Sequence, residues 1–205
     1  MVEIECNPIR KEELEKGMEL LMHSFKEEAI TSRAFDFTKE NTEQILVKLS
    51  ILKAEAYLQS GSPILVAKVN GEIAGIAIVK EKSTLTKRQM LDIIWPTGIR
   101  ALPLITKLNW RKAAKLGRAI KEAENIPEPF ITLEAIAVHP DYRGFGVGKA
   151  LMKEVQAIAA EEGQTIYLYT GDKKNEEIYR HLGYGTLEQR AVEDIVVYHM
   201  IKKAV

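Results

Sequence analysis

The chain has 205 residues, of which 46% are hydrophobic, so it is long enough to bury the core of one sizeable domain. Its 29 basic and 29 acidic side chains cancel, which offers no whole-chain case for binding nucleic acid or a membrane surface. Cys6 is the only cysteine, which excludes an internal disulfide, and no segment has the 18 or so consecutive apolar residues of a membrane-spanning helix. Because the N-terminus also lacks a signal-peptide pattern, a cytoplasmic protein is predicted.

The first third of the chain predicts one strand followed by two helices. Apolar side chains alternate with glutamates over residues 2–6, as in a half-buried strand, until an Asn-Pro pair ends the pattern. Apolar side chains then follow a helical stripe over residues 14–25 and again over residues 41–59. The connection, residues 31–37, holds two phenylalanines without helical periodicity. It is predicted to be a loop, either pinned by its aromatic side chains or in contact with a ligand.

A β-hairpin is predicted next. Residues 64–69 and 72–79 have strand composition and flank Asn70-Gly71. An Asn-Gly pair supplies the positive φ angles that a two-residue turn requires, so the two strands should be antiparallel neighbours.

Residues 80–125 predict two or three short helices, separated near Pro96 and Asn109. Up to residue 121 this segment carries eleven basic and only two acidic side chains. The bias is typical of the solvated outer face of amphipathic helices, but it also fits a contact for an anionic acceptor, a cofactor phosphate or a partner. Trp95 and Trp110 flank its apolar part and are predicted to be packing anchors.

A glycine-rich run, residues 143–148, connects a predicted strand to a predicted helix. Residues 133–138 are apolar apart from Glu134, which indicates a strand buried on both faces. Helical spacing then runs from Lys149 to a stop at Gly163. Glycines on alternate positions let a ligand approach the backbone, and the free N–H groups of a helix start favour an anion. The run predicts a phosphate or pyrophosphate site, although a tight turn without a ligand would use the same residues.

Two common phosphate-binding fingerprints do not match this run. The nucleoside-triphosphate loop needs glycine at the position of Arg143 and serine or threonine at that of Ala150. The dinucleotide fingerprint needs its third glycine at Lys149 and opens the first βαβ unit of a domain. An unrelated nucleotide-binding enzyme is therefore disfavoured.

The pattern R-x-x-G-x-G, from Arg143 to Gly148, resembles the coenzyme A pyrophosphate loop of the GNAT N-acetyltransferase superfamily. A second stretch, from Asn175 to Tyr184, is similar to that family's N-x-x-x-Y-x-x-x-G-[FY] segment. The two motifs occur in the family's order, separated by a helix and a predicted strand over residues 165–170. Without a ligand, Asn175 and Tyr179 would be a helix cap and a packed aromatic side chain.

The resemblance implies an α/β (α+β) fold. A mixed, mostly antiparallel central sheet would be flanked by helices on both faces and would open between the strand of Leu133 and the strand of Ile166. Two closing strands are predicted over residues 186–189 and 194–201.

The resemblance also implies how the chain is organised. Residues 1–205 would form one N-acetyltransferase domain, with a helical insertion at about 84–126 and a cofactor-binding core over 131–184. A helical insertion of this kind is similar to the branch of puromycin N-acetyltransferase. That branch usually carries Leu-Glu-Thr at the end of the later strand, whereas this chain has Leu168-Tyr169-Thr170, so any role of that glutamate cannot be carried over.

The activity implied by the resemblance is transfer of an acetyl group from acetyl-CoA to a primary amine, by direct attack within a ternary complex. A catalytically silent acetyl-CoA-binding regulatory protein is the alternative. The acceptor would be a small molecule or a peptide. No metal, nucleic acid or membrane partner is expected, and the chain would be a monomer or a homodimer.

The resemblance finally assigns site residues. Tyr179 is expected to be the acid that protonates the leaving thiolate. Glu134 is the leading candidate for the base, since an acid within an apolar strand is costly unless it is used or reaches water; it could equally lie at an exposed strand start or pair with Arg180. His139 and His199 are weaker candidates. The residues expected to bind the cofactor are Ile136, Ala137, Val138, Arg143, Gly144, Phe145, Gly146, Val147, Gly148, Lys149, Asn175 and Tyr179.

Overall fold

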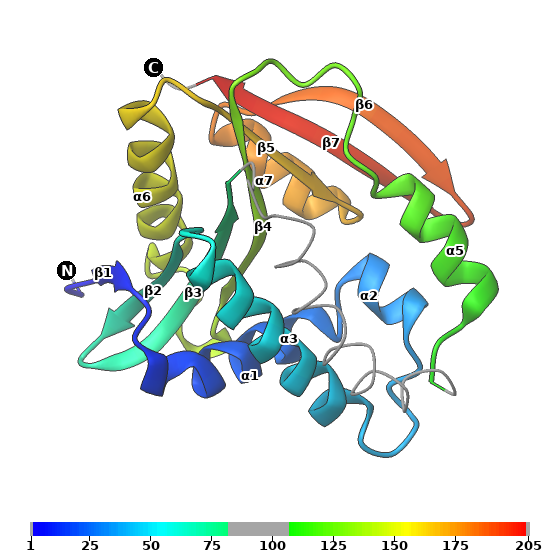
Figure 1. Cartoon of the computed structure of the whole chain (residues 1–205), viewed down its shortest axis with the longest axis horizontal. Helices are drawn as coiled ribbons and strands as arrows, with labels where there is room; N and C mark the ends of the chain where they lie inside the picture. The colour runs from blue at the N-terminus through cyan, green and yellow to red at the C-terminus, as the bar shows by residue number, and fades with distance from the viewer. Residues whose placement is uncertain (1, 82–106, 204–205) are drawn as a thin grey trace.

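The structure, a computed structural model, describes residues 2–81 and 107–203 (Figure 1). Its centre is a seven-stranded sheet in the order β1-β2-β3-β4-β5-β7-β6. All neighbouring strands are antiparallel except β4 and β5, which are parallel, so the predicted mixed, mostly antiparallel sheet is confirmed. The strands are β1 (Glu5–Pro8), β2 (Ile64–Val69), β3 (Glu72–Lys80), β4 (Phe130–Val138), β5 (Thr165–Thr170), β6 (Gly185–Val192) and β7 (Ile195–Lys203).

Helices cover both faces of the sheet (Figure 1). One core cluster joins α1 and α3 to β2, β3 and β4, and another joins α6 to the opposite face of the same strands. The residues at the end of α7 pack on the α6 side, while α2 and α5 pack together over β6 and β7. The helices are η1 (Lys11–Glu13), α1 (Leu14–Phe25), α2 (Ala29–Ala34), α3 (Thr42–Gln59), α5 (Trp110–Ala119), η3 (Pro140–Tyr142), α6 (Val147–Glu161) and α7 (Lys173–His181). None of the helices within the described residues is long and apolar enough to cross a lipid bilayer.

The hairpin and the long helices agree with their predictions. Asn70 and Gly71 have φ angles of 51° and 79° and join β2 to β3 as an antiparallel pair. Helices α1 and α3 match the two apolar stripes, and Gly163, with a φ of 62°, follows the end of α6. Each of these elements depends on residues that are close together in the sequence, so the local residue pattern predicts it well.

Two predictions in the first third were wrong. The first strand spans Glu5–Pro8 rather than residues 2–6, because β1 is an edge strand, where a proline that cannot donate a hydrogen bond is tolerated. Residues 31–34, predicted to be loop, form the second half of α2. That helix is started by Glu28, whose carboxylate accepts the N–H groups of Ile30 at 3.0 Å and Thr31 at 2.9 Å.

The basic segment contributes one described helix, α5, and the remaining predicted helices, residues 82–106, lie outside the described residues. Asn109 begins α5 by accepting the Lys112 N–H at 3.3 Å, which confirms the predicted break there. The apolar side of α5 is buried against β6 and β7. Trp110 is 58% exposed, so it is not the packing anchor that was predicted.

His199 connects α5 to the sheet. It is fully buried on β7, with Nε2 2.8 Å from the carbonyl oxygen of Ala119 and Nδ1 2.6 Å from the Tyr167 hydroxyl. A carbonyl can only accept, so Nε2 carries the proton and Nδ1 accepts from the tyrosine. Burial lowers the pKa of His199 below its usual 6.5. The histidine therefore has a structural role and is not a base at the candidate site.

We expect His199→Phe to lower the free energy of unfolding by about 2–4 kcal/mol, because the Tyr167 hydroxyl and the Ala119 carbonyl both lose a partner. Neutral His199 stabilises the fold above the unfolded-state pKa of about 6.5. This stability is lost as the pH falls below that value, where the unfolded chain binds more protons. Urea unfolding at pH 8 and pH 5.5 should therefore show a smaller difference for the variant than for the wild type. The matched control is His181→Asn at an exposed histidine, and an equal pH difference in His199→Phe would contradict the assignment.

Candidate active site

Strands β4 and β5 pair over only three residues and then separate. The pairs are Phe130 with Thr165, Ile131 with Ile166, and Thr132 with Tyr167, whereas β4 continues to pair with β3 as far as Val138. The predicted opening between these strands is therefore confirmed, and it widens towards their C-terminal ends.

No described strand pairs with β4 along the edge that faces the opening. The N–H of His139 donates to the Ala74 carbonyl at 2.8 Å, towards β3. Successive residues of a strand present their N–H and C=O groups to alternate sides, so those of Ile136 and Val138 point away from β3 and into the opening. An extended ligand could pair with these groups as an additional strand would.

Glu134 is the extra residue of a β-bulge. Ala135 pairs with Ile78 and Leu133 with Val79, which leaves Glu134 without a counterpart on β3. A bulge bends its strand and redirects a side chain, and such features are frequent beside active sites. No bulge was predicted from the sequence, although a carboxylate within an otherwise apolar strand is the feature that could have indicated one.

The glycine run forms a left-handed turn into α6. Gly144 and Gly146 have φ angles of 84° and 90°, which glycine adopts without strain. The first helical hydrogen bond is from the N–H of Ala150 to the Gly146 carbonyl, so the N–H groups of Val147, Gly148 and Lys149 have no acceptor within the helix. A cluster of free N–H groups at a helix N-terminus suits a phosphate.

The residues of the loop that were predicted to bind the cofactor are not equally available to a ligand. The Phe145 N–H already donates to the Tyr142 carbonyl at 3.4 Å, so it is a weaker donor for a ligand than those that follow. Arg143 and Lys149 are exposed, and neither forms an ion pair within the described residues. They could add two positive charges to a pyrophosphate site. Val138 lies beside Gly148, where a Cβ would be 3.5 Å from Val138 Cγ2, so the strand end and the loop are adjacent.

Tyr179 lies on α7, one helical turn after the half-buried Asn175. Its ring packs edge-to-face on Tyr184 at 5.7 Å and contacts the same cluster as Ile136 and Val138, so the structure brings the predicted tyrosine to the strand of the opening. Burial, with a contribution from the charge of Glu28, raises the pKa of Tyr179 to about 12. Its side chain is partly buried by the surrounding cluster.

Glu134 pairs with Lys53 and not with Arg180, the partner that was considered from the sequence. Its carboxylate forms an ion pair with Lys53 on α3, whereas Arg180 lies 3.7 Å from Glu176. Lys53 also lies over the ring of Tyr57 at 5.4 Å, and the Tyr57 hydroxyl lies close to the same carboxylate. Glu134 thus lies within β4, facing α3, with its side chain 19% exposed.

Two further tyrosines border Glu134. Burial, followed by the charge of Glu134, raises the pKa of both Tyr57 and Tyr169, so both phenols stay protonated over the physiological range. Tyr169 lies on β5, across the opening from Glu134. Lys53 and Tyr57 were missed in the sequence. The spacing of four residues that puts them on one helix face does not show what the face contacts.

The histidine next to the loop has a local role. His139 is half-buried, and its Nδ1 accepts the N–H of Asp141 at 3.3 Å, so it shapes the turn before the glycine run as predicted. Within the described residues, no group of three or more His, Cys, Asp or Glu side chains is arranged to hold a metal ion.

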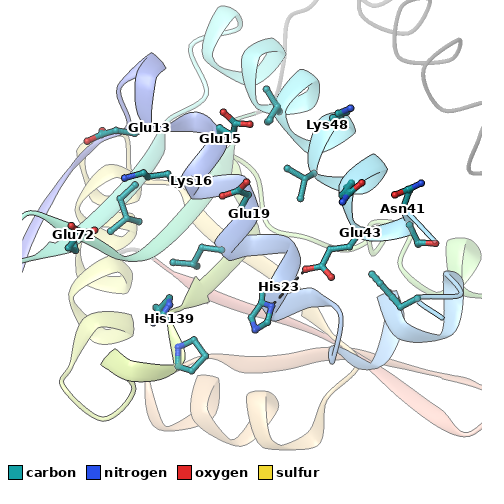
Figure 2. Close-up of a pocket in the computed structure, with 18 of the residues that line it drawn as sticks. Glu13, Glu15, Lys16, Glu19, His23, Asn41, Glu43, Lys48, Glu72 and His139 are labelled. Atoms are coloured by element: carbon teal, nitrogen blue, oxygen red, sulfur yellow. Dashed lines mark ion pairs between the residues drawn. The ribbon is translucent and has the colours of Figure 1, made fainter. Parts of the chain in front are cut away.

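An open groove of about 1240 Å³ lies elsewhere, on the outer side of α1 (Figure 2). Glu15 and Glu19 of α1 face Glu43 and Lys48 of α3 across it, with an ion pair between His23 and Glu43 at 3.8 Å. Glu134, Tyr179 and the glycine loop are not among the residues that line this groove. Its size alone therefore does not make it the site.

Comparison with known proteins agrees with this geometry. The model of the acetyltransferase (GNAT) family matches residues 24–184, most of the chain. The chain is 30% identical over 73 residues to the uncharacterized protein YyaT of Bacillus subtilis (strain 168); the match covers 36% of the chain and 49% of that protein. The chain thus matches about half the length of this curated relative.

Solved structures share the fold. A histone acetyltransferase HPA2 and related acetyltransferase from Corynebacterium glutamicum has a TM-score of 0.71 at 20% identity, covering 100% of this chain and 98% of that one. The yncA acetyltransferase from Salmonella typhimurium, solved with its cofactor acetyl-CoA, has a TM-score of 0.60 at 15% identity, covering 99% and 95%. The open sheet and the glycine loop agree with the family match, which shows that the chain belongs to the acetyltransferase (GNAT) family.

Proposed function

We propose that the protein transfers the acetyl group of acetyl-CoA to a primary amine of a small molecule or peptide, by direct attack within a ternary complex. The observation that carries the proposal is the separation of β4 from β5, which leaves backbone groups of β4 free between the glycine loop and Glu134. A long, thin cosubstrate with a phosphate end fits this arrangement.

Different residues of the chain would bind different parts of acetyl-CoA. The N–H groups of Val147, Gly148 and Lys149, with the charge of Arg143, would hold the pyrophosphate. The backbone of residues 136–138 would pair with the pantetheine arm, and Asn175 and Tyr179 would border it from α7. Bound acetyl-CoA supplies an activated acyl group and a thiolate leaving group.

A base is needed because most free amines are protonated at neutral pH. An amine with the pKa of lysine, about 10.4, is about 3.4 units above pH 7, which corresponds to roughly 4.6 kcal/mol. We assign proton removal to Glu134, which lies in the opening on the side of α3. Its ion pair with Lys53 orients the carboxylate, and an incoming ammonium would compete with Lys53 for it. Backbone N–H groups at the end of β4 are the available donors for the oxyanion.

Glu134→Gln should lower kcat/KM about 10-fold at pH 7 and remove the acidic limb of its pH profile, because the amide cannot accept the proton. Glu122→Gln is the matched control: that carboxylate also pairs with a lysine near the site, Lys80 at 3.0 Å, but is outside the opening's strands. A pH profile with an unchanged acidic limb in Glu134→Gln would remove this residue as the base.

The reaction itself is tested by incubating the protein with acetyl-CoA and a panel of a polyamine, an aminoglycoside, an amino acid and a peptide with a free N-terminus, while following thiol release. Amine-dependent release is expected for at least one class, and competition at the same site by coenzyme A but not by ATP or NAD. Tight coenzyme A binding with no release from any amine would instead support a catalytically silent acetyl-CoA-binding protein.

A further inference from the structure

Glu28 is a partly buried carboxylate that the assigned chemistry does not use. It precedes α2, and its Oε2 is saturated by the N–H groups of Ile30 and Thr31 and by the Thr31 hydroxyl, at 2.9–3.1 Å. Its Oε1 is buried and has no hydrogen-bond partner among residues 2–81 and 107–203. The three bonds at Oε2 hold the carboxylate in one orientation, so Oε1 is a fixed acceptor.

An unpaired carboxylate oxygen is costly within a protein. A charged group that is removed from water loses free energy unless hydrogen bonds replace the water, and most buried polar atoms accordingly have a partner. A fixed acceptor of this kind at a binding site is a position where a ligand's donor can supply the missing bond.

The packing of α2 puts Glu28 at the wide end of the opening. A Cβ at Gly171, directly after β5, would lie 2.8 Å from Ile30 Cγ1 and 3.4 Å from the Cβ of Ala29. The first turn of α2 therefore lies against the end of β5, where that strand has already left β4. The charge of Glu28 also contributes to the raised pKa of both Tyr169 and Tyr179, which agrees with a carboxylate close to the opening.

Among residues 2–81 and 107–203, no basic side chain forms an ion pair with Glu28. Glu134 is paired with Lys53. Arg33, one turn further along α2, gives its guanidinium to Asp194 at 2.9 and 2.5 Å and to the Ala29 carbonyl at 2.8 Å. Of the two carboxylates at the opening, Glu28 is thus the one that offers a free charged acceptor.

We propose that Oε1 of Glu28 binds the protonated amine of the acceptor and selects cationic amines over neutral acceptors. This inference rests on the proposed N-acetyltransferase function. An ammonium supplies the donor that Oε1 lacks and a positive charge beside Tyr179, where the acetyl group would be transferred. Glu28 binds and positions the amine, while Glu134 remains the group that takes its proton.

The test uses Glu28→Gln, because the amide oxygen can still accept the N–H groups that begin α2 while the charge is lost. The expected result is a KM for the amine raised about 10-fold or more, with kcat changed less than about threefold and coenzyme A affinity unchanged. Glu28→Asp keeps the charge and should recover part of the loss. Glu27→Gln, at the exposed neighbouring carboxylate, is the matched control and should behave as wild type.

A binding measurement separates this inference from the proposed function. Protein saturated with coenzyme A is titrated with n-butylammonium chloride and with 1-pentanol, its neutral analogue of similar length. We expect the ammonium to bind more tightly than the alcohol in the wild type and at least about 10-fold more weakly to Glu28→Gln. Equal binding of the two probes, or an ammonium affinity or amine KM that Glu28→Gln leaves unchanged, would overturn the role of Glu28. Absence of thiol release with every amine would instead count against the transferase, whatever the probes show.

Discussion

Tyr179→Phe should lower kcat by about 10² or more while leaving coenzyme A affinity almost unchanged. The substitution keeps the ring, which packs on Tyr184 at 5.7 Å, and removes only the hydroxyl. The leaving thiolate would need a proton, and the Tyr179 hydroxyl belongs to a partly buried side chain that packs on the same cluster as Ile136 and Val138 of β4. A tyrosine that only packed against the cofactor would show weaker binding on loss of the ring but little effect on loss of the hydroxyl.

The raised pKa of Tyr179 bears on whether the phenol would transfer its proton to the thiolate or first donate a hydrogen bond to it. For an ordinary phenol near 10 and a thiol near 8.5, proton transfer to the thiolate would be uphill by about 1.5 units, or roughly 2 kcal/mol. With a pKa of about 12, the gap grows to about 3.5 units, roughly 5 kcal/mol. The phenol thus stays protonated throughout the assay range, and in the proposed mechanism it would act first as a hydrogen-bond donor to the developing thiolate. The wild-type rate should accordingly show no loss below about pH 10 that comes from Tyr179.

Tyr184→Phe is the control for this experiment. It removes a neighbouring phenol hydroxyl that is buried and has no hydrogen-bond partner within the described residues, but that is not the proposed proton donor. Its kcat should equal that of the wild type, and its stability should be equal or slightly higher, since an unsatisfied buried group is removed. Wild-type turnover by Tyr179→Phe, or an equal loss in both variants, would exclude Tyr179 as the proton donor.

Gly146→Val should weaken coenzyme A binding by about 10²-fold or more, measured by calorimetry on the folded protein. Gly146 immediately precedes α6 with a φ of 90°, next to the free N–H groups that would hold the pyrophosphate. A branched side chain there would occupy the space through which a phosphate must approach. Among the described residues, the added Cβ would meet only Ile4 Cδ1, at 3.9 Å, so they leave room for it.

Backbone strain is separated from ligand contact by Gly163→Val. Gly163 follows the other end of α6 with a φ of 62°, and a Cβ there would have nothing within 4 Å. Both variants place a branched residue in the left-handed region, which costs about 1–2 kcal/mol, but only Gly146 lies at the loop. Gly163→Val should bind coenzyme A as the wild type does. Unchanged affinity in a folded Gly146→Val protein would refute the placement of the pyrophosphate.

The sequence by itself determined the parts of this protein whose cause is local. The Asn70-Gly71 hairpin, the stripes of α1 and α3, and the turn from β4 into α6 depend on residues within a few positions of one another. Positive φ angles, helical periodicity and free N–H groups at a helix start are properties of short segments. The family motifs lie in such segments, which is why the fold and the candidate cofactor loop could be predicted.

Only the tertiary structure decided which distant groups meet in the opening. Glu134 and its partner Lys53 are 81 residues apart, and the charge of Glu28 contributes to the raised pKa of Tyr169 and Tyr179, with α2 packed on Gly171. The bulge at Glu134, the burial of His199 under α5 and the formation of α2 in a predicted loop likewise depend on packing between elements. The residue pattern of one segment does not show which surface that segment will contact. Charge pairing and pKa values at the site were therefore set by the assembled sheet and helices.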